Sequence, residues 1–285
     1  MIPPANLHNK IRNLDSLPAI PSIAQKILAL KINTDEGERS LLNLIEKDPP
    51  LLSKIIGMAN SPLLGVGREI LTLHDAAALL GVKRVKMTAL SLAMMSSLKR
   101  KSVGRLNIDA LWKHSLSITM IMETLAGLMP KDRRPPDDET HLSGLLHDIG
   151  FLVLDYLDPS LSDQFQERLT AAPERSVEEI EAEMLEMDHC KLGAELAHYW
   201  NLPESIIAVL RHRQTPFDDR ASVGLPLVAM ANLAEKLLPV FRNAESSQAN
   251  IVPGKWLALG IDPLHVEQVK AQALEYSKHT TELYF

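Results

Sequence analysis

The adjacent pair His147 and Asp148 carries the strongest chemical signal in this sequence, because it lies within the apolar segment 144–150. Burying an imidazole and a carboxylate side by side is costly unless each group has a partner. Both are also ligands for divalent transition metals, so further ligands converging on the pair would create a metal site. The pair therefore indicates either a metal-dependent hydrolase or a buried polar network in a protein with another role.

Three further histidines are candidates to join this pair, since each lies on or beside a different predicted helix. They are His114, His189 and His212. A helical bundle can gather such side chains into one interior site. Imidazole and carboxylate ligands together suit Mn, Fe, Ni or Zn, and a bound metal can activate water for phosphoester hydrolysis. These five residues are the predicted metal ligands, with His147 and Asp148 as the catalytic candidates.

A structural role is the alternative for every member of this set, because polar residues near a core are usually just hydrogen-bonded. His114 fits a half-buried position on a helix, and His189 fits a local capping arrangement at a helix start. His212 stands between two arginines, which is typical of a solvated helix end. For His147 and Asp148 the residues leave both interpretations open.

The elements that must position these residues are helices. Leu, Ala and Met are abundant, aromatic residues make up only 4% of the chain, and most segments show the three-to-four spacing of amphipathic helices. No alternating strand pattern with hairpin signals is visible. The sequence thus predicts an all-α fold, a multi-helix bundle with an additional N-terminal helical subdomain. Helices are predicted at 22–32, 38–47, 51–59, 73–80, 83–98, 111–129, 140–149, 150–156, 161–169, 177–187, 191–200, 204–213, 224–238, 253–259 and 263–277.

Three regions follow from this pattern: an N-terminal helical subdomain at 1–105, a helical bundle at 106–240 and a C-terminal helical extension at 241–285. Prolines punctuate the first region and interrupt its helices. The basic run 99–101 is interpreted as a solvated helix end that could add to a partner surface. The polar segment 242–250 is predicted to be a loop.

Composition excludes several classes of protein. The 285 residues carry a net charge of −6, which argues against broad nucleic-acid binding. The single cysteine, Cys190, excludes an internal disulfide and fits a reducing compartment. No apolar stretch approaches the roughly 20 residues that span a bilayer, and no secretory signal is recognisable at the N-terminus. We therefore expect a cytoplasmic protein that does not bind membranes.

Over about residues 17–238 the sequence resembles the HDOD (HD-related output domain) family of bacterial signalling proteins. The resemblance rests on segments 17–21 (LPAIP), 47–51 (KDPPL), 59–62 (ANSP), 77–81 (AALLG), 111–115 (LWKHS), 144–150 (GLLHDIG), 188–189 (DH), 192–194 (LGA), 200–203 (WNLP) and 211–212 (RH). Their combined order is highly specific. Residues 241–285 are not clearly covered.

HDOD proteins are similar to the HD superfamily of metal-dependent phosphohydrolases, which includes HD-GYP enzymes that cleave cyclic di-GMP. The resemblance implies that His114, His147 and Asp148 match the first three metal-ligand positions of that superfamily. It also implies that His189 and His212 match additional histidines of the HD-GYP type. A divalent metal and a nucleotide or cyclic dinucleotide ligand follow as expectations.

Four departures from the enzyme pattern favour a site that has lost its activity. Asn232 stands where the superfamily has a later aspartate, and its neutral carbonyl is a weaker ligand for a hard cation. Phe151 replaces a common lysine, and Arg213 replaces a second histidine. An apolar ring cannot stabilise a transferring phosphoryl group as a cation would. No Gly-Tyr-Pro motif is visible.

The leading hypothesis is therefore a non-catalytic bacterial regulator that acts by binding another protein, with the N-terminal helices and their junction to the bundle as the recognition surface. The alternative is a working metal-dependent phosphohydrolase, a phosphodiesterase acting on a nucleotide or cyclic dinucleotide. A third possibility is a protein that binds a metal or nucleotide without turning it over. Convergence of the five predicted ligands, or its absence, is the observation that bears most directly on this choice.

Overall fold

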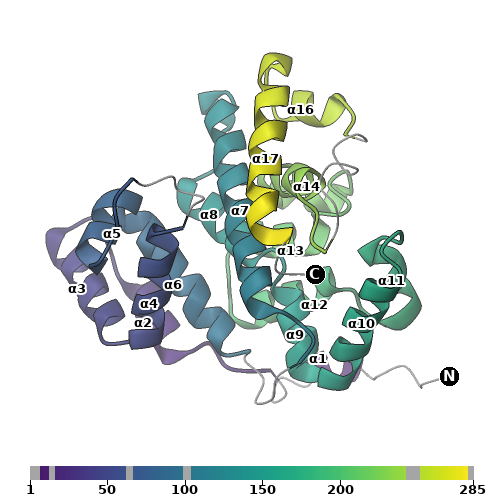
Figure 1. Ribbon diagram of the computed structural model, residues 1–285, viewed down its shortest axis with the longest axis horizontal. Helices are drawn as coiled ribbons and strands as arrows, with labels where there is room; N and C mark the ends of the chain where they lie inside the picture. Colours follow the sequence, from purple (N-terminus) through teal and green to yellow (C-terminus); the bar gives the residue numbers. More distant parts are fainter. Residues whose placement is uncertain (1–6, 13–16, 62–66, 99–103, 242–250, 282–285) are drawn as a thin grey trace. The chain divides into compact units, whose positions relative to one another are not determined.

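The computed structural model describes residues 7–12, 17–61, 67–98, 104–241 and 251–281. Within these ranges the chain forms α-helices and short 3-10 helices and no strand (Figure 1). The prediction of an all-α fold is thus confirmed. The basic run 99–101 and the predicted loop 242–250 lie outside the described residues.

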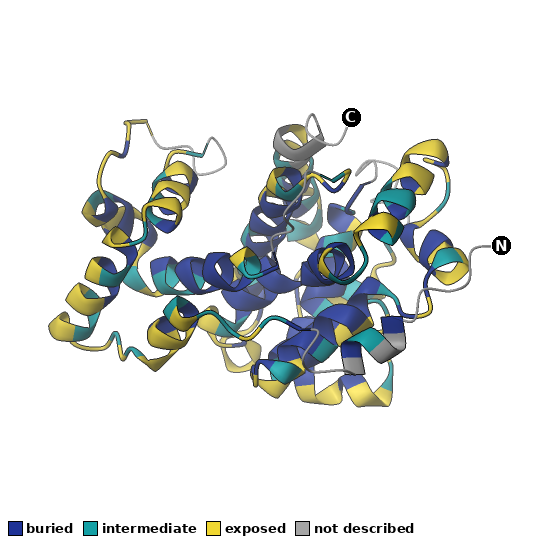
Figure 2. Cartoon of the chain, turned by 90° about the horizontal axis from the view of Figure 1, so that it is seen from below, coloured by how far each residue is buried: buried dark blue, intermediate teal, exposed yellow. Residues whose placement is uncertain are grey.

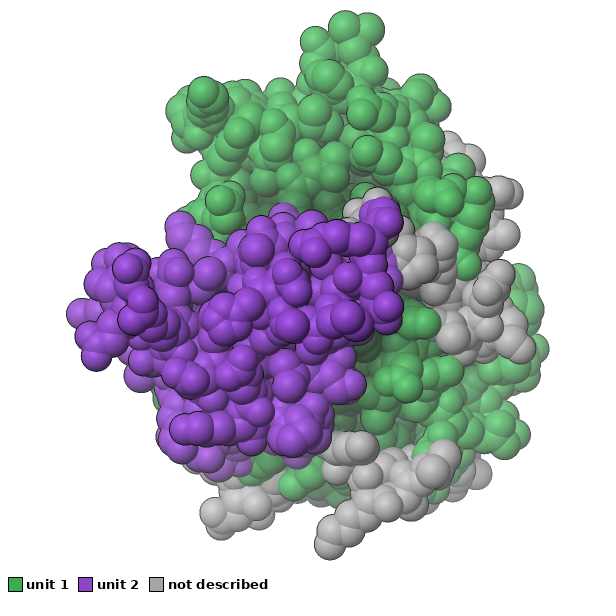
Figure 3. All heavy atoms as spheres, turned by 60° about the vertical axis from the view of Figure 1, so that its left-hand side comes forward, with its two compact units in different colours: residues 1–18, 98–285 green, residues 19–97 purple. Residues whose placement is uncertain are grey.

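The chain divides into two compact units, coloured separately in Figure 3. One comprises residues 1–18 together with 98–285, and the other comprises residues 19–97. The division of the chain at residues 105 and 240 stays a prediction. All five predicted metal ligands belong to the larger unit.

The smaller unit is built from short helices whose starts are set by capping side chains. Its helices are α2 (Ser22–Ala29), α3 (Asp35–Glu46), α4 (Pro49–Ala59), α5 (Leu73–Leu80) and α6 (Val82–Ser96). Thr34, Asp48 and Thr72 each accept a hydrogen bond from a backbone N–H in the first turn of α3, α4 and α5. Such caps satisfy N–H groups that have no partner within the helix. The helix starts expected from the Thr and Pro signals are close to the observed ones.

The larger unit holds the remaining helices. They are α1 (Leu7–Arg12), α7 (Ile108–Leu128), α8 (Asp137–Leu146), α9 (Ile149–Leu157), α10 (Pro159–Ala171), α11 (Val177–Met184), α12 (His189–Tyr199), α13 (Glu204–His212), α14 (Leu227–Leu237), α16 (Gly254–Ala258) and α17 (Val266–Thr281), with 3-10 turns η3 (Lys131–Arg133), η4 (Asp219–Gly224) and η5 (Pro263–His265). No helix of the described residues is long and apolar enough to cross a membrane.

Helix α7 is the centre of this unit, and it packs against α8, α14 and α17. Residues along most of its length are buried, and Figure 2 shows buried residues concentrated where helices face one another. Trp256 and Val269 of the C-terminal segment belong to the same apolar core as Leu125 of α7 and Leu233 of α14. Removing this apolar surface from water is the main force that holds the helices together.

Two glycines allow the helices near the predicted site to approach closely. A Cβ atom at Gly144 of α8 would lie 2.6 Å from the Cα atom of Thr119 on α7. A Cβ atom at Gly150 of α9 would lie 1.8 Å from the carbonyl oxygen of His189 on α12. Only glycine fits at such distances. These two contacts bring α7, α8, α9 and α12 close enough to share polar side chains.

His147 and Asp148 do not lie inside one continuous helix, as the predicted helix 140–149 implied. Helix α8 ends at Leu146, and Asp148 is the residue that precedes the first turn of α9, with φ −103° and ψ 15°. Apolar periodicity misses this break because the residues on both sides of it are buried. The break matters because neighbours in a regular helix point about 100° apart, whereas here both side chains reach the same cluster.

Candidate metal centre

Four side chains from three parts of the larger unit converge in its interior. They are His114 of α7, His147 and Asp148 of the α8–α9 break, and Glu235 of α14. Each offers one ligand atom, and these four atoms lie within 4.8 Å of one another. The side chains of the first three are at most 1% exposed, and that of Glu235 is 22% exposed.

Two of the distances among these atoms match those between ligands of a single ion, and two are slightly longer. His147 Nε2 lies 3.1 Å from Asp148 Oδ2 and 3.2 Å from Glu235 Oε2. His114 Nε2 lies 3.5 Å and 3.7 Å from the same two oxygens. Neighbouring ligands bound to one ion at about 2.1 Å lie roughly 3.0 to 3.4 Å apart. The cluster therefore needs only small adjustments to hold a metal.

All four ligand atoms are buried and none has a hydrogen-bond partner. Buried polar atoms are nearly always hydrogen-bonded, so four unsatisfied atoms that face one another require an explanation. His147 Nδ1 lies 2.8 Å from the carbonyl oxygen of Gly144, to which it donates, so in the neutral ring Nε2 directs its lone pair at the cluster. Two imidazole nitrogens and two carboxylate oxygens form a donor set that fits a divalent transition metal.

The charges in the cluster shift the pKa of its members. Burial lowers the pKa of His147, but the nearby carboxylates of Asp148 and Glu235 outweigh this and raise it to about 9. Burial raises the pKa of Asp148, whereas His147 and Arg213 lower it below its ordinary value. Asp148 is therefore an anionic ligand at neutral pH. A metal would displace the proton from His147, because only neutral imidazole binds metal.

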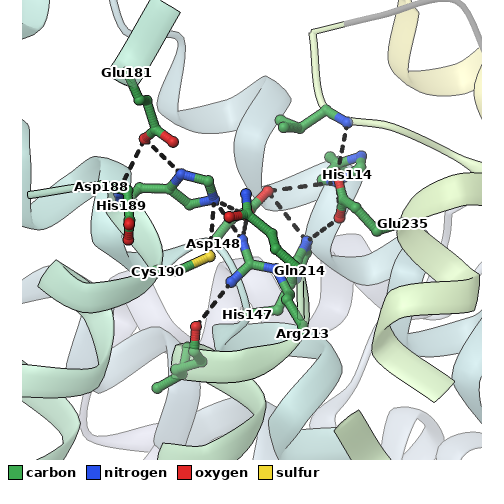
Figure 4. Close-up of polar contacts among 12 residues, drawn as sticks. His114, His147, Asp148, Glu181, Asp188, His189, Cys190, Arg213, Gln214 and Glu235 are labelled. Atoms are coloured by element: carbon green, nitrogen blue, oxygen red, sulfur yellow. Dashed lines mark hydrogen bonds and ion pairs between the residues drawn. The ribbon is translucent and has the colours of Figure 1, made fainter. Parts of the chain in front are cut away.

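Asp148 faces a different set of groups with its second oxygen, Oδ1, and Figure 4 shows it between the two sets. The guanidinium Nη2 of Arg213 lies 2.5 Å from Oδ1 and 2.6 Å from Nε2 of His189. His189 Nε2 is itself 3.6 Å from Oδ1. Since arginine only donates, His189 Nε2 must accept here. Arg213 is thus bound between a carboxylate and a neutral imidazole.

His189 is held in this orientation by its own neighbours. Its Nδ1 donates to Glu181 Oε1 at 2.6 Å, and its ring stacks on Phe151 with centroids 4.1 Å apart. Cys190 Sγ lies 3.7 Å from His189 Nε2. His189 therefore contacts Asp148 Oδ1 and lies outside the four-atom cluster. Phe151, the residue in place of a lysine, is fully buried and serves as packing for this imidazole.

The structure does not bring His212 or Asn232 into the cluster. His212 ends α13, and the charges that act on it are those of Asp218, Arg220 and Arg211. Asn232 donates from Nδ2 to the carbonyl oxygen of Arg213 at 2.5 Å, and its Oδ1 accepts from Lys255 Nζ at 2.5 Å. Both ends of this amide are engaged in other contacts, and Asn232 is not part of the cluster.

Glu235 supplies the second carboxylate of the cluster, and sequence reasoning missed it. It lies three residues after Asn232, hence on the same face of α14. That spacing is the signal that could have identified Glu235, because a carboxylate one turn away can replace one at the motif position. Of the predicted residues, His114, His147 and Asp148 converge with it.

Comparison with known proteins places the chain in a family. A family model described as HDOD domain matches residues 17–216. An uncharacterised protein of Treponema pallidum (strain Nichols) is 24% identical over 229 residues, which are 79% of this chain and 43% of that protein. The chain therefore spans less than half the length of this curated relative.

Two solved structures share the fold. A candidate signal transduction protein from Marinobacter aquaeolei VT8 has a TM-score of 0.75 at 23% identity, and the match covers 98% of this chain and 64% of that one. A candidate metal-dependent phosphohydrolase from Shewanella amazonensis SB2B has a TM-score of 0.61 at 17% identity, covering 98% and 96% of the two chains. At these identities the likeness concerns the fold alone.

Proposed function

Because the chain belongs to the HDOD domain family, we propose that it is a regulatory module in bacterial signal transduction, holding one divalent metal ion without hydrolysing a phosphoester. His114, His147, Asp148 and Glu235 hold the ion in this proposal. The observation that carries it is the convergence of four buried ligand atoms that lack hydrogen-bond partners. When bound, the metal links α7, α14 and the α8–α9 break.

A non-catalytic role is supported by what surrounds the ligands. Three of the four ligand side chains are at most 1% exposed, so a phosphoester substrate would have little access to an ion between them. Phe151 is buried against His189 and offers no charge to a transferring phosphoryl group. Neither feature suits hydrolysis of an external substrate.

The partner in this proposal is another protein, bound by the smaller unit. That unit exposes Leu28, Leu71 and Leu79 at 42%, 69% and 42%, and in this proposal the partner covers Leu71, the most exposed of the three. The net charge of −6 disfavours a polyanion as partner. The wild type and a Leu71→Glu variant, used as baits in the source cell, test this step. If the two baits capture the same protein in equal amounts, Leu71 is not part of the binding surface.

The alternative is a metal-dependent phosphohydrolase acting on a nucleotide or cyclic dinucleotide. The same four-residue cluster supports it, since a bound metal of this kind lowers the pKa of a water ligand and so supplies a nucleophile. Binding of a nucleotide without turnover is the intermediate outcome.

Metal analysis combined with an activity assay decides between the two. Protein purified without chelator is analysed for Mn, Fe, Ni and Zn and assayed with bis-p-nitrophenyl phosphate and with cyclic di-GMP. We expect one metal ion per chain and no turnover. His147→Ala should lose the ion, whereas His198→Ala, a change at an exposed histidine of α12, should retain it. Metal-dependent turnover that His147→Ala abolishes would establish the enzyme instead.

A further inference from the structure

The carboxylate of Asp148 has two unlike neighbourhoods, and the difference suggests a role for Arg213. Oδ2 faces His114, His147 and Glu235, whose ligand atoms have no hydrogen-bond partner. Oδ1 faces a cation that is already part of the chain, the guanidinium of Arg213. Asp148 thus has the geometry of a carboxylate that bridges two positive groups, of which the protein itself supplies one.

Arg213 is the largest fully buried side chain of the described residues, with 2% of its surface exposed. Its guanidinium keeps its charge at any relevant pH, so burial without anionic partners would be prohibitive. Nη2 contacts Asp148 Oδ1 and His189 Nε2, and Nη1 donates to the carbonyl oxygen of Leu210 at 3.3 Å. The group therefore fills the space between an imidazole nitrogen and a carboxylate oxygen, both of which are metal ligands in other proteins.

Charge balance indicates how many ions this centre can hold. Three carboxylates, those of Asp148, Glu181 and Glu235, lie in the cluster or its direct contacts, together with the single fixed positive charge of Arg213. His114 and His147 are neutral as metal ligands, and His189 is neutral because its Nε2 accepts from Arg213, so the net charge is minus two. One divalent ion neutralises it. A second would leave an excess of two positive charges in a buried site, which is strongly unfavourable.

We propose that Arg213 limits the centre to one metal ion, because its guanidinium takes the position beside Asp148 Oδ1 that a second cation would need. The inference rests on the proposed metal site and makes Arg213 the residue that determines its stoichiometry. Without the guanidinium, Asp148 Oδ1 and His189 Nε2 would be left 3.6 Å apart, with Cys190 Sγ 3.7 Å from the imidazole nitrogen. These three atoms are the donors that Arg213 keeps from a second ion.

Titration with cobalt(II) tests the inference by stoichiometry, measured by equilibrium dialysis and by the absorption of the bound ion. The full chain should bind one equivalent and stay at one in cobalt excess. Arg213→His, which removes the fixed charge and adds a ligand, should bind two. Arg213→Lys keeps a positive charge and should bind one. Arg211→His, an exposed position in the last turn of α13 two residues earlier, is the matched control and should also bind one.

The outcomes separate this inference from the proposed function. No cobalt bound by the wild type overturns the metal site and the role of Arg213 together. One equivalent in both the wild type and a folded Arg213→His overturns only the role of Arg213. Two tight equivalents in the wild type overturn it as well, and this measurement requires no variant. If circular dichroism shows Arg213→His to be unfolded, Arg213→Gln takes its place in the same comparison.

Discussion

The two sides of Asp148 differ in how their polar atoms are satisfied. On the Oδ1 side, Arg213 and His189 bind the carboxylate directly, and Glu181 fixes His189 in turn. On the Oδ2 side, two histidines and Glu235 lie near the carboxylate without hydrogen-bonding it. Hydrogen bonds between side chains therefore satisfy the polar atoms of one side, whereas those of the other side face one another without hydrogen-bond partners. Stability and ligand binding are thus assigned to opposite oxygens of one residue.

The largest expected effect concerns the Oδ1 side. Arg213→Ala leaves the buried Asp148 without its arginine partner, and breaking a buried ion pair costs about 3–5 kcal/mol of the free energy of unfolding. Arg211→Ala breaks an exposed pair with Glu195 and should cost about 1 kcal/mol or less. Urea unfolding with a chelator present measures both. Equal losses in the two variants would contradict the difference between the two sides.

The second prediction concerns the Oδ2 side and compares stability with and without metal. A free metal concentration one hundredfold above Kd should stabilise the wild type by about 2.7 kcal/mol, because the ion binds only the folded state. Glu235→Gln should lose most of this gain and unfold much as the wild type does in chelator. Glu195→Gln, an exposed change on α12, should keep the gain. Thermal unfolding with and without chelator measures it, and a wild type indifferent to metal would refute the expectation.

The close contact of α9 with α12 can be disturbed without changing any polar group. Gly150→Ala places a methyl group against the carbonyl oxygen of His189, and such overpacking should cost about 1–3 kcal/mol. A Cβ atom at Gly127 of α7 would meet no atom within 4 Å. Because alanine favours the helix more than glycine does, Gly127→Ala should be neutral or stabilise the fold by up to about 1 kcal/mol. Chemical unfolding of both variants checks the sign. A harmless Gly150→Ala would mean that the Oδ1 side is less tightly packed than described.

The smallest effect is expected at Asn232. Asn232→Asp restores the residue type of the enzyme pattern, but the side chain already contacts Lys255 and the backbone of Arg213. We expect one metal equivalent, an apparent Kd changed by less than about threefold, and a stability loss of about 1 kcal/mol from the missing hydrogen bond. Metal titration of the variant gives the answer. A strongly tightened Kd would make position 232 a ligand position after all.

The helices of the fold could be predicted because burial follows a regular period. The start of α5 after Thr72 and the end of α4 at Ala59 match the expectations from caps and breakers. The break between α8 and α9 could not be predicted, because apolar residues continue across it. Such a break depends on contacts between helices, including those at Gly144 and Gly150, that no local pattern contains.

The candidate site was predictable to the extent that its residues lie in motifs. His114, His147 and Asp148 converge, and their role as metal ligands stays a prediction. Glu235 belongs to no motif, since its place in the cluster depends on how α14 is turned against α7. Arg213 is visible in the sequence only as a missing histidine. Its contact with Asp148, 65 positions earlier in the chain, requires the folded structure.

The partial exposure of Glu235 bears on how fast a metal ion would enter and leave the cluster. It is the one member of the cluster with an appreciably exposed side chain, at 22%, and it belongs to α14. Because the other three ligand side chains are at most 1% exposed, an ion held here would leave or enter on the side of Glu235, and movement of α14 would widen that route. The lifetime of the bound state would then follow the motion of one helix. Exchange of the ion would then be slower than at a surface site.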